Sequence, residues 1–209
     1  MEKTSPNLSK YCYRSSVQRM MEMGKEAWLA QMEQNYPRVH PKPLDRSARE
    51  AWADEYDVLC GAFRELPEQY RKLQIIFEFV MPAKSRADPD DPTCRADAVL
   101  LSRDTVTVFE FKRHEGHVPR FDRQARKYAK RLRRYHTGSV GMKKHTVMVP
   151  TRGHDVWEPC YRLLVCSPDR LAEAIRLKAG SGKLPNQAVK QWLSAEWRFE
   201  EESQTETRN

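Results

Sequence analysis

Apolar residues recur at helical spacing through the first third of the chain. They predict one helix over residues 14–34, and the three prolines of YPRVHPKP (36–43) end it. A second helix is predicted next, with Asp45 or Ser47 as its N-cap residue. The periodicity of this second helix comes from Trp52, Glu55, Tyr56, Leu59 and Phe63.

The middle of the chain changes to short apolar runs typical of β-strands. LQIIFEFVMP (73–82) predicts a buried strand, and a polar loop rich in proline follows it over 83–94. RADAVLLSRDTVTVFEFK (95–112) predicts a hairpin, because SRDT has the length of a tight turn. The remaining predicted elements are a helix over 122–136, strands over 145–150 and 161–167, and helices over 168–179 and 185–197. This order indicates a mixed α/β domain with helices packed around a central sheet.

The predicted hairpin places charged residues inside apolar strands. Side chains alternate across a strand, so Glu110 and Lys112 share one face. Pairing Leu101 with Val106 then places Asp97 opposite Glu110, and residues opposed in this way have Cβ atoms about 4.5–5.5 Å apart. Two facing carboxylates repel each other, and their desolvation costs several kcal/mol, roughly, for each ion.

A divalent cation between Asp97 and Glu110 would explain this arrangement, because hard cations such as Mg²⁺ bind carboxylate oxygens. Lys112 projects from the same face, where it could hold a phosphate oxygen or a metal-bound water. The alternative is that Asp97 and Lys112 mark a solvated strand end. Glu78, in the preceding strand, could be a further metal ligand or could pair with Arg95 or Lys112. Glu55 is a weaker candidate for an acid behind the site.

The helix over 122–136 separates into two faces at 3.6 residues per turn. One arc, which includes Gln124 and Tyr128, is expected to pack on the sheet. Seven cations are expected to face outward: Arg123, Arg126, Lys127, Lys130, Arg131, Arg133 and Arg134. A run of like charges repels itself unless phosphates or counterions lie between them. The alternative for these cations is that they form only a solvated face. For Gln124 and Tyr128, the alternative is a role in helix packing.

Composition adds a polyanionic partner to this picture. The chain has 209 residues and a formal net charge of +8. Four acids and one arginine fall in the last ten residues, so the remainder carries +11. A basic folded body suggests nucleic acid. No apolar run is long enough for a membrane span and the N-terminus has no signal-peptide core, so we expect a cytoplasmic protein without a membrane partner.

Cysteine and histidine usage gives only a weak metal signal. The five cysteines are scattered and form no CxxC pair, which argues for reduced thiols and against an iron–sulfur cluster. His114 and His117 flank HEGH after the second hairpin strand. With a cysteine they could bind zinc, but two histidines three apart are weak evidence for a site, and a loop beside the substrate is the favoured interpretation.

The pattern Asp97…Glu110-Phe111-Lys112 resembles the PD-(D/E)xK nuclease motif, with Ala96 where the motif name has proline. Gln124 and Tyr128 match the Q-x-x-x-Y helix of the RecB-like branch. The run from the Trp52 helix to RAD also resembles nuclease-like domains at the N-terminus of some bacterial helicase-like ATPases. The resemblance covers roughly residues 12–150. The chain has no Walker A sequence, so any ATPase or helicase would be a separate partner.

The resemblance implies a restriction-endonuclease-like fold and Mg²⁺- or Mn²⁺-dependent hydrolysis of DNA. It implies Asp97, Glu110 and Lys112 as catalytic residues, with Asp97, Glu110 and Glu78 as metal ligands. Nucleic acid would contact Gln124, Tyr128, Arg126, Lys130, Arg133 and Arg134. The alternatives are a silent DNA-binding or adaptor module of the same fold, and an RNA-directed nuclease.

We expect one domain across 1–209. Its parts are a helical extension over 1–44, an α/β core over 45–178, a C-terminal helix over 179–199 and an acidic tail over 200–209.

Overall fold

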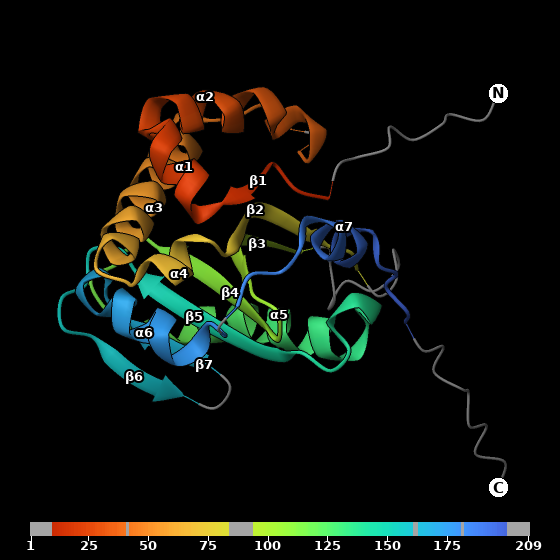
Figure 1. Ribbon diagram of the computed structural model, residues 1–209. Helices are drawn as coiled ribbons and strands as arrows, with labels where there is room; N and C mark the ends of the chain where they lie inside the picture. Colours follow the sequence, from red (N-terminus) through yellow and green to blue (C-terminus); the bar gives the residue numbers. More distant parts are fainter. Residues whose placement is uncertain (1–9, 41, 84–93, 161–162, 181, 200–209) are drawn as a thin grey trace, which may run out of the picture.

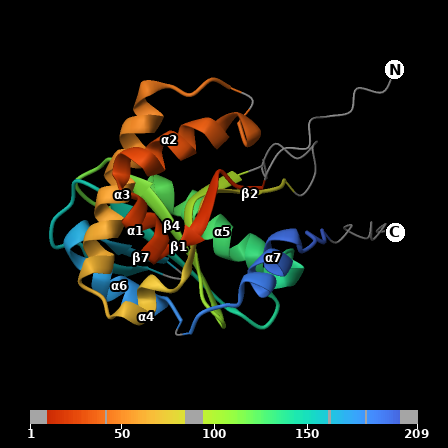
Figure 2. The same cartoon turned by 45° about the horizontal axis from the view of Figure 1, so that its top comes forward.

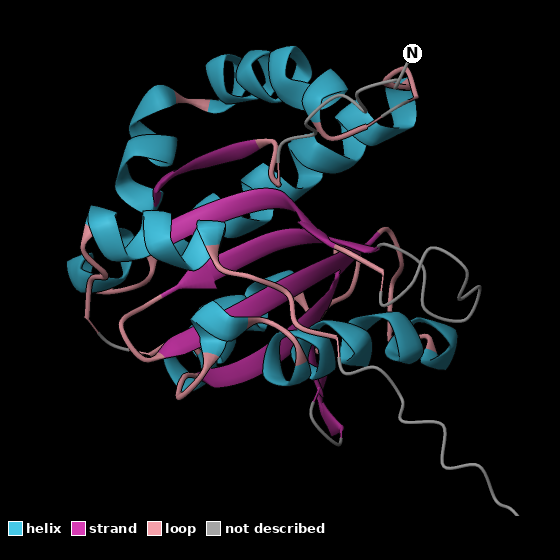
Figure 3. Ribbon diagram, turned by 90° about the vertical axis from the view of Figure 1, so that its right-hand side faces the viewer, coloured by secondary structure: helices cyan, strands magenta, loops and turns pink. Residues whose placement is uncertain are grey.

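A seven-stranded mixed sheet with helices on both faces organises the molecule (Figures 1 and 3). The computed structural model describes residues 10–40, 42–83, 94–160, 163–180 and 182–199. The predicted polar loop therefore lies largely outside the described residues, as does the acidic tail. The strands are β1 (Tyr13–Ser16), β2 (Gln74–Met81), β3 (Cys94–Leu101), β4 (Thr105–Lys112), β5 (Lys143–Pro150), β6 (Trp157–Cys160) and β7 (Leu163–Cys166).

The strand order is β1-β2-β3-β4-β5-β7-β6. Strands β1 to β4 pair antiparallel, as do β6 and β7, whereas β5 pairs parallel with both β4 and β7. A parallel neighbour requires a crossover connection, and helix α5 (Asp122–Arg134) supplies it between β4 and β5. This helix starts shortly after β4 ends, which brings its first turns close to Glu110 and Lys112.

The other helices are α1 (Val17–Met23), α2 (Lys25–Asn35), α3 (Arg46–Arg64), α4 (Glu68–Arg71), α6 (Leu171–Lys178) and α7 (Asn186–Ser194). Short 3₁₀ segments cover Tyr36–Arg38, Pro119–Phe121, Thr137–Ser139 and Pro168–Arg170. Two apolar clusters form the core. Residues of α3 and α6 cover one sheet face, while α5 and α7, which lie next to each other in Figure 2, cover the other.

The predicted second helix, hairpin and core strands are confirmed. Asp45 is the N-cap of α3, where its Oδ1 accepts a hydrogen bond of 2.8 Å from the Ala48 amide. The hairpin register is also confirmed, since Leu101 pairs with Val106 and Val99 with Val108.

The predicted single helix over 14–34 is wrong. Tyr13–Ser16 instead forms β1, the sheet's edge strand beside β2. Ser16 then caps α1, and Gly24, at φ 81° and ψ 160°, separates α1 from α2. Helical periodicity continues across this break because both helices place apolar side chains on the same core. The sequence pattern also does not predict β6, because this strand is only four residues long and partly exposed.

Strands β2 and β3 exchange faces halfway along their length. Ile75 and Phe77 pack in the α3 cluster, whereas Phe79 and Met81 pack in the α5 cluster. Glu78, between them, has a φ of 53°, in the left-handed region. The paired positions run from Phe77–Ala98 to Phe79–Ala96, so the ladder skips Glu78 and its opposite residue Asp97. The inversion turns two acidic residues out of the regular alternation at one level of the sheet.

Along the described part of the chain, every helix is too short or too polar to cross a membrane.

Candidate active site

One cavity of about 490 Å³ opens at the level where β2 and β3 exchange faces. We call it the central cavity. Strands β2, β3 and β4 supply its acids, Glu78, Asp97 and Glu110, together with Lys112 at the end of β4. Its remaining lining residues are Cys94, Arg95, Arg120, Arg123, Gln124 and Lys127. The structure thus brings together the predicted catalytic residues, the predicted metal ligands and Gln124.

The antiparallel ladder of β3 and β4 ends at Ala98–Phe109, one pair before Asp97 would face Glu110. Beyond this pair, the Asp97 side chain replaces the backbone of β3 as hydrogen-bond acceptor, because its Oδ2 accepts a hydrogen bond of 2.7 Å from the Phe111 amide. Burial, and then the charge of Glu110, raise the pKa of Asp97 well above its usual range. The two acids therefore interact unfavourably when both are ionised.

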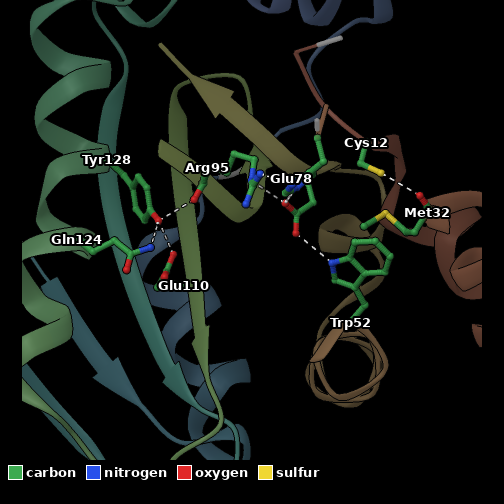
Figure 4. A network of polar contacts seen from close by, with 9 residues as sticks. Cys12, Met32, Trp52, Glu78, Arg95, Glu110, Gln124 and Tyr128 are labelled. Carbon is green, nitrogen blue, oxygen red and sulfur yellow. Dashed lines mark hydrogen bonds and ion pairs between the residues drawn. The ribbon is translucent and has the colours of Figure 1, made fainter. Parts of the chain in front are cut away.

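Glu110 is fully buried and touches two predicted functional residues. Its Oε1 forms an ion pair with Lys112 Nζ. Its Oε2 lies 2.6 Å from the Tyr128 hydroxyl, which is also 2.7 Å from the carbonyl oxygen of Arg95. The Gln124 amide donates to the same hydroxyl at 2.9 Å (Figure 4). One hydroxyl hydrogen cannot serve both oxygens fully, so a carboxyl proton on Glu110 would complete this network.

The pKa of Glu110 agrees with a proton on its carboxyl group. Burial raises it, Lys112 lowers it, and the net shift is upward. For Lys112, burial acts to lower the pKa, but the charges of Glu110 and Asp97 outweigh it and the net pKa rises. Lys112 therefore remains an ammonium group within the cavity.

Glu78 pairs with Arg95, one of the two partners expected for it. Its Oε2 lies 3.1 Å from Arg95 Nε and 3.2 Å from His40 Nε2. Its Oε1 accepts a hydrogen bond of 3.0 Å from the Trp52 indole (Figure 4). Arg95 Nη1 lies 2.5 Å from His40 Nδ1, so that nitrogen is the acceptor and Nε2 carries the hydrogen that faces Glu78. Despite burial, these contacts lower the pKa of Glu78.

Glu55 lies behind the cavity on α3, and its side chain is buried. Its Oε2 has no hydrogen-bond partner among the described residues. Burial, followed by the charges of Asp97 and Glu78, raises the pKa of Glu55 well above its usual range. The site therefore concentrates four acids, and fewer cations than acids lie beside their carboxyl groups.

The carboxylates of Glu78, Asp97 and Glu110 are not gathered around one point. Among the described residues, the group of three His, Cys, Asp or Glu side chains whose ligand atoms all lie within 4.8 Å of one another is His117, Glu158 and Cys160. Glu78 does not join such a group because both its oxygens turn to Trp52, His40 and Arg95. His114, the first histidine of HEGH, packs against the Phe121 ring in a tilted arrangement instead.

Helix α5 differs from its prediction at Gln124, which is exposed rather than packed on the sheet, and at Arg131. Helical periodicity predicts that Arg131 faces outward, but this side chain is fully buried. Its Nη1 donates hydrogen bonds of 3.0 Å to the carbonyl oxygens of Met81 and Pro82. The guanidinium therefore satisfies backbone carbonyl oxygens at the end of β2. Arg131 stands beside the packed arc of the helix, and a long side chain can reach polar groups from there.

The other predicted nucleic-acid contacts lie at different distances from the cavity. Gln124 lines it, and Tyr128 is buried beneath it. Arg126 is partly buried and pairs with Asp122 at 3.1 Å. Three further predicted contacts are exposed along the helix: Lys130, Arg133 and Arg134.

Sequence reasoning missed several residues that line the cavity: Arg120, Arg123 and Lys127. A signal for two of them was present, because Arg123 and Lys127 each precede a residue of the Gln124…Tyr128 pair. Residues at i, i+4, i+7 and i+11 form one row on a helix. Arg123, Lys127, Lys130 and Arg134 follow that spacing, so a row of cations leads out of the cavity along α5.

Comparison with known proteins gives no family. No protein-family model matches the sequence, and a search of curated proteins returns no match. Among solved structures, the chain is similar to protein VC1899 from Vibrio cholerae, with 12% sequence identity and a TM-score of 0.36. The match covers 63% of this chain and 34% of VC1899, so it spans about a third of that protein's length.

Proposed function

We propose that the protein is a metal-dependent nuclease that hydrolyses phosphodiester bonds of DNA, built on a restriction-endonuclease-like core. One observation carries the proposal. Asp97, Glu110 and Lys112 meet in a single cavity that is also lined by Arg95, Arg120, Arg123 and Lys127. Carboxylates without enough cations fit a bound metal, while the surrounding cations fit a phosphate backbone.

The donor set fits a hard divalent cation. Asp97 and Glu110 offer carboxylate oxygens, and burial raises the pKa of each, so a bound cation would stabilise their ionised forms. Glu78, the predicted third ligand, would have to release Arg95 or His40 to join them. When bound, the metal would activate a water and polarise the scissile phosphate.

The chain's own residues divide the other tasks. Lys112 stays protonated beside Glu110 and is available to offset the negative charge that builds on the phosphate. Tyr128 positions the Glu110 carboxyl through a contact of 2.6 Å, and Gln124 donates a hydrogen bond of 2.9 Å to the Tyr128 hydroxyl. Arg123 and Lys127 hold the strand by its backbone, so cleavage should show little sequence preference.

The experiment incubates the purified protein with plasmid, linear duplex, single-stranded DNA and RNA, each with Mg²⁺, Mn²⁺ or EDTA. We expect DNA cleavage that requires the metal and is lost in Asp97→Asn, Glu110→Gln and Lys112→Met. The matched control is Glu173→Gln on the exposed side of α6, which should cleave like wild type. Cleavage in EDTA would remove the metal from the mechanism. Binding without cleavage would favour the silent module, and cleavage of RNA alone would favour the RNA-directed nuclease.

A further inference from the structure

A second group of potential metal ligands lies outside the central cavity. His117 comes from the loop after β4, and Glu158 and Cys160 come from the edge strand β6. Their ligand atoms all lie within 4.8 Å of one another. Imidazole nitrogen, carboxylate oxygen and thiolate sulfur are the three ligand types that proteins use for Zn²⁺. None of these residues lines the central cavity.

Strand β6 presents its two ligands together. Glu158 and Cys160 are two residues apart and therefore share one face of the strand. Their partners on β7 are Val165 and Leu163, which pack against Ala125 of α5. The ligand pair thus faces the start of α5, where His117 also lies.

His117 is oriented as a metal-binding histidine usually is. Its Nδ1 lies 2.6 Å from Glu158 Oε2, on the side of the ligand group. Its Nε2 lies 2.6 Å from Asp122 Oδ1, on the other side. A carboxylate behind the imidazole fixes the ring and its tautomer at many metal sites. The His117 side chain is 13% exposed and that of Glu158 is 50% exposed, so solvent reaches the group from the Glu158 side.

We propose that His117, Glu158 and Cys160 bind one Zn²⁺ ion, with Asp122 holding His117 in place and water completing a tetrahedral site. A protonated His117 between the Glu158 and Asp122 carboxylates would explain the position of the histidine. It would not explain why the Cys160 sulfur lies next to it. Formation of the Cys160–zinc bond replaces the S–H bond, and zinc also displaces the hydrogen that His117 Nδ1 shares with Glu158. Both protons pass to solvent. Burial, and then the charges of Asp122 and Glu158, raise the pKa of Cys160, and a bound cation would reverse that effect.

A bound ion would connect β6 to the segment that carries Arg120 and starts α5. Arg120 and Arg123 line the central cavity, so zinc would fix the wall of the cavity without entering it. Zinc would therefore affect only the arrangement of the central cavity, and zinc binding itself does not depend on the proposed nuclease activity.

The test measures zinc and cobalt binding by the full chain. Protein loaded with Zn²⁺ and passed through gel filtration should retain about one ion per chain. The Co²⁺-loaded protein should show a thiolate-to-cobalt charge-transfer band. Both should be lost in Cys160→Ser and His117→Asn, and Asp122→Asn should weaken zinc affinity by about 10–100-fold. The matched control is His114→Asn, which is in the same loop, also partly buried, and outside the ligand group.

Asp97→Asn separates this site from the central cavity and should leave zinc retention unchanged. Loss of zinc in Asp97→Asn, with retention in His117→Asn, would place the ion in the central cavity and overturn the proposal. So would a cobalt complex without a sulfur band, or wild-type protein that retains no zinc. Wild-type protein that retains zinc but cleaves no nucleic acid with Mg²⁺ or Mn²⁺ would contradict the proposed function and leave this site standing.

Discussion

At the scale of single residues, the central cavity is defined by buried acids whose pKa values are raised. Asp97, Glu55 and Glu110 all have pKa values raised by burial and by neighbouring acids. Glu78 is the exception, because Arg95 and His40 offset its burial. A fold selected for stability alone has no reason to retain the first three as acids. Their cost in free energy is consistent with a role in binding a cation.

Removing the Asp97 charge should therefore stabilise the protein when metal is absent. The amide oxygen introduced by Asp97→Asn would still accept the Phe111 amide hydrogen that Asp97 Oδ2 now accepts. We expect Asp97→Asn to raise the free energy of unfolding in EDTA, because an amide costs less to bury than an ionised carboxyl group. Urea unfolding measures it. Asp104→Asn, in the turn of the same hairpin, removes a carboxylate that has Ser102 and Thr105 as donors, so that variant should not gain stability. A destabilised Asp97→Asn protein would show that the charge has a partner.

His136 also lowers the stability of the folded state, but it does so only at low pH. It is buried between Trp192 and Trp197, and burial lowers its pKa from 6.5 to about 4. The unfolded chain binds the proton more tightly, so stability is complete above about pH 6.5 and is lost as pH falls toward about 4. The loss at about pH 5 should be about 2 kcal/mol.

Unfolding of His136→Gln at several pH values checks this prediction. The variant should have a shallower dependence of unfolding free energy on pH over that window, whatever its stability at neutral pH. His154→Gln, a change at an exposed histidine, is the control and should follow the wild-type slope. Parallel slopes for wild type and His136→Gln would show that His136 is protonated in the folded state.

At the scale of elements, local backbone geometry decided what the sequence pattern could predict. The hairpin and α3 were predictable because alternation, turn length and the Asp45 cap all agree. Strand β1 and the break at Gly24 were not, because apolar spacing continues across them. The inversion at Glu78 was also invisible, since a positive φ at a non-glycine residue leaves no mark in a hydrophobic pattern.

Gly24 should be required where it stands. Its φ of 81° and ψ of 160° lie in a region that essentially only glycine adopts. A Cβ there would meet nothing within 4 Å, so any cost comes from the backbone alone. Gly24→Ala should lower the free energy of unfolding by about 1–3 kcal/mol. Gly61, inside α3, is also open to a Cβ but is helical, so Gly61→Ala should instead raise it by about 0.5–1 kcal/mol. Equal effects in the two variants would contradict this account, and thermal unfolding distinguishes them.

At the scale of the whole molecule, the topology assembles a site from segments far apart in sequence. The sequence predicted Asp97, Glu110 and Lys112 because they sit in one hairpin with a readable register. It offered Arg95 as one of two partners for Glu78, but it could not predict the contact of His40 with Glu78 or that Arg120 reaches the cavity. Those contacts depend on how β2, the Tyr36–Arg38 turn and the start of α5 meet in space. It likewise separated His117 from Cys160 by 43 positions, a distance that the pairing of β6 with β7 closes.

The row of cations along α5 offers a path for a nucleic-acid strand leaving the central cavity. Lys130 and Arg134 continue the row beyond Lys127, whereas Arg126 and Arg133 lie to one side of it. We expect Lys130→Gln with Arg134→Gln to weaken binding to all DNA sequences alike. The slope of log affinity against log salt should fall by about 0.7–0.9 for each lost phosphate contact. The helix should persist, since glutamine is a good helix former.

Titration of labelled DNA at several salt concentrations tests the path. The paired variant Arg126→Gln with Arg133→Gln removes the same charge from the side of the row, so it is the matched comparison. A smaller change in slope for that pair would place the strand along the row, and equal changes would indicate a broad contact that includes all four predicted residues. Arg131 has to be left intact in both variants, because it donates to the Met81 and Pro82 carbonyl oxygens. Salt slopes unchanged from wild type in both variants would make the outer turns of α5 a solvated face and direct the search to Arg120 and Arg123.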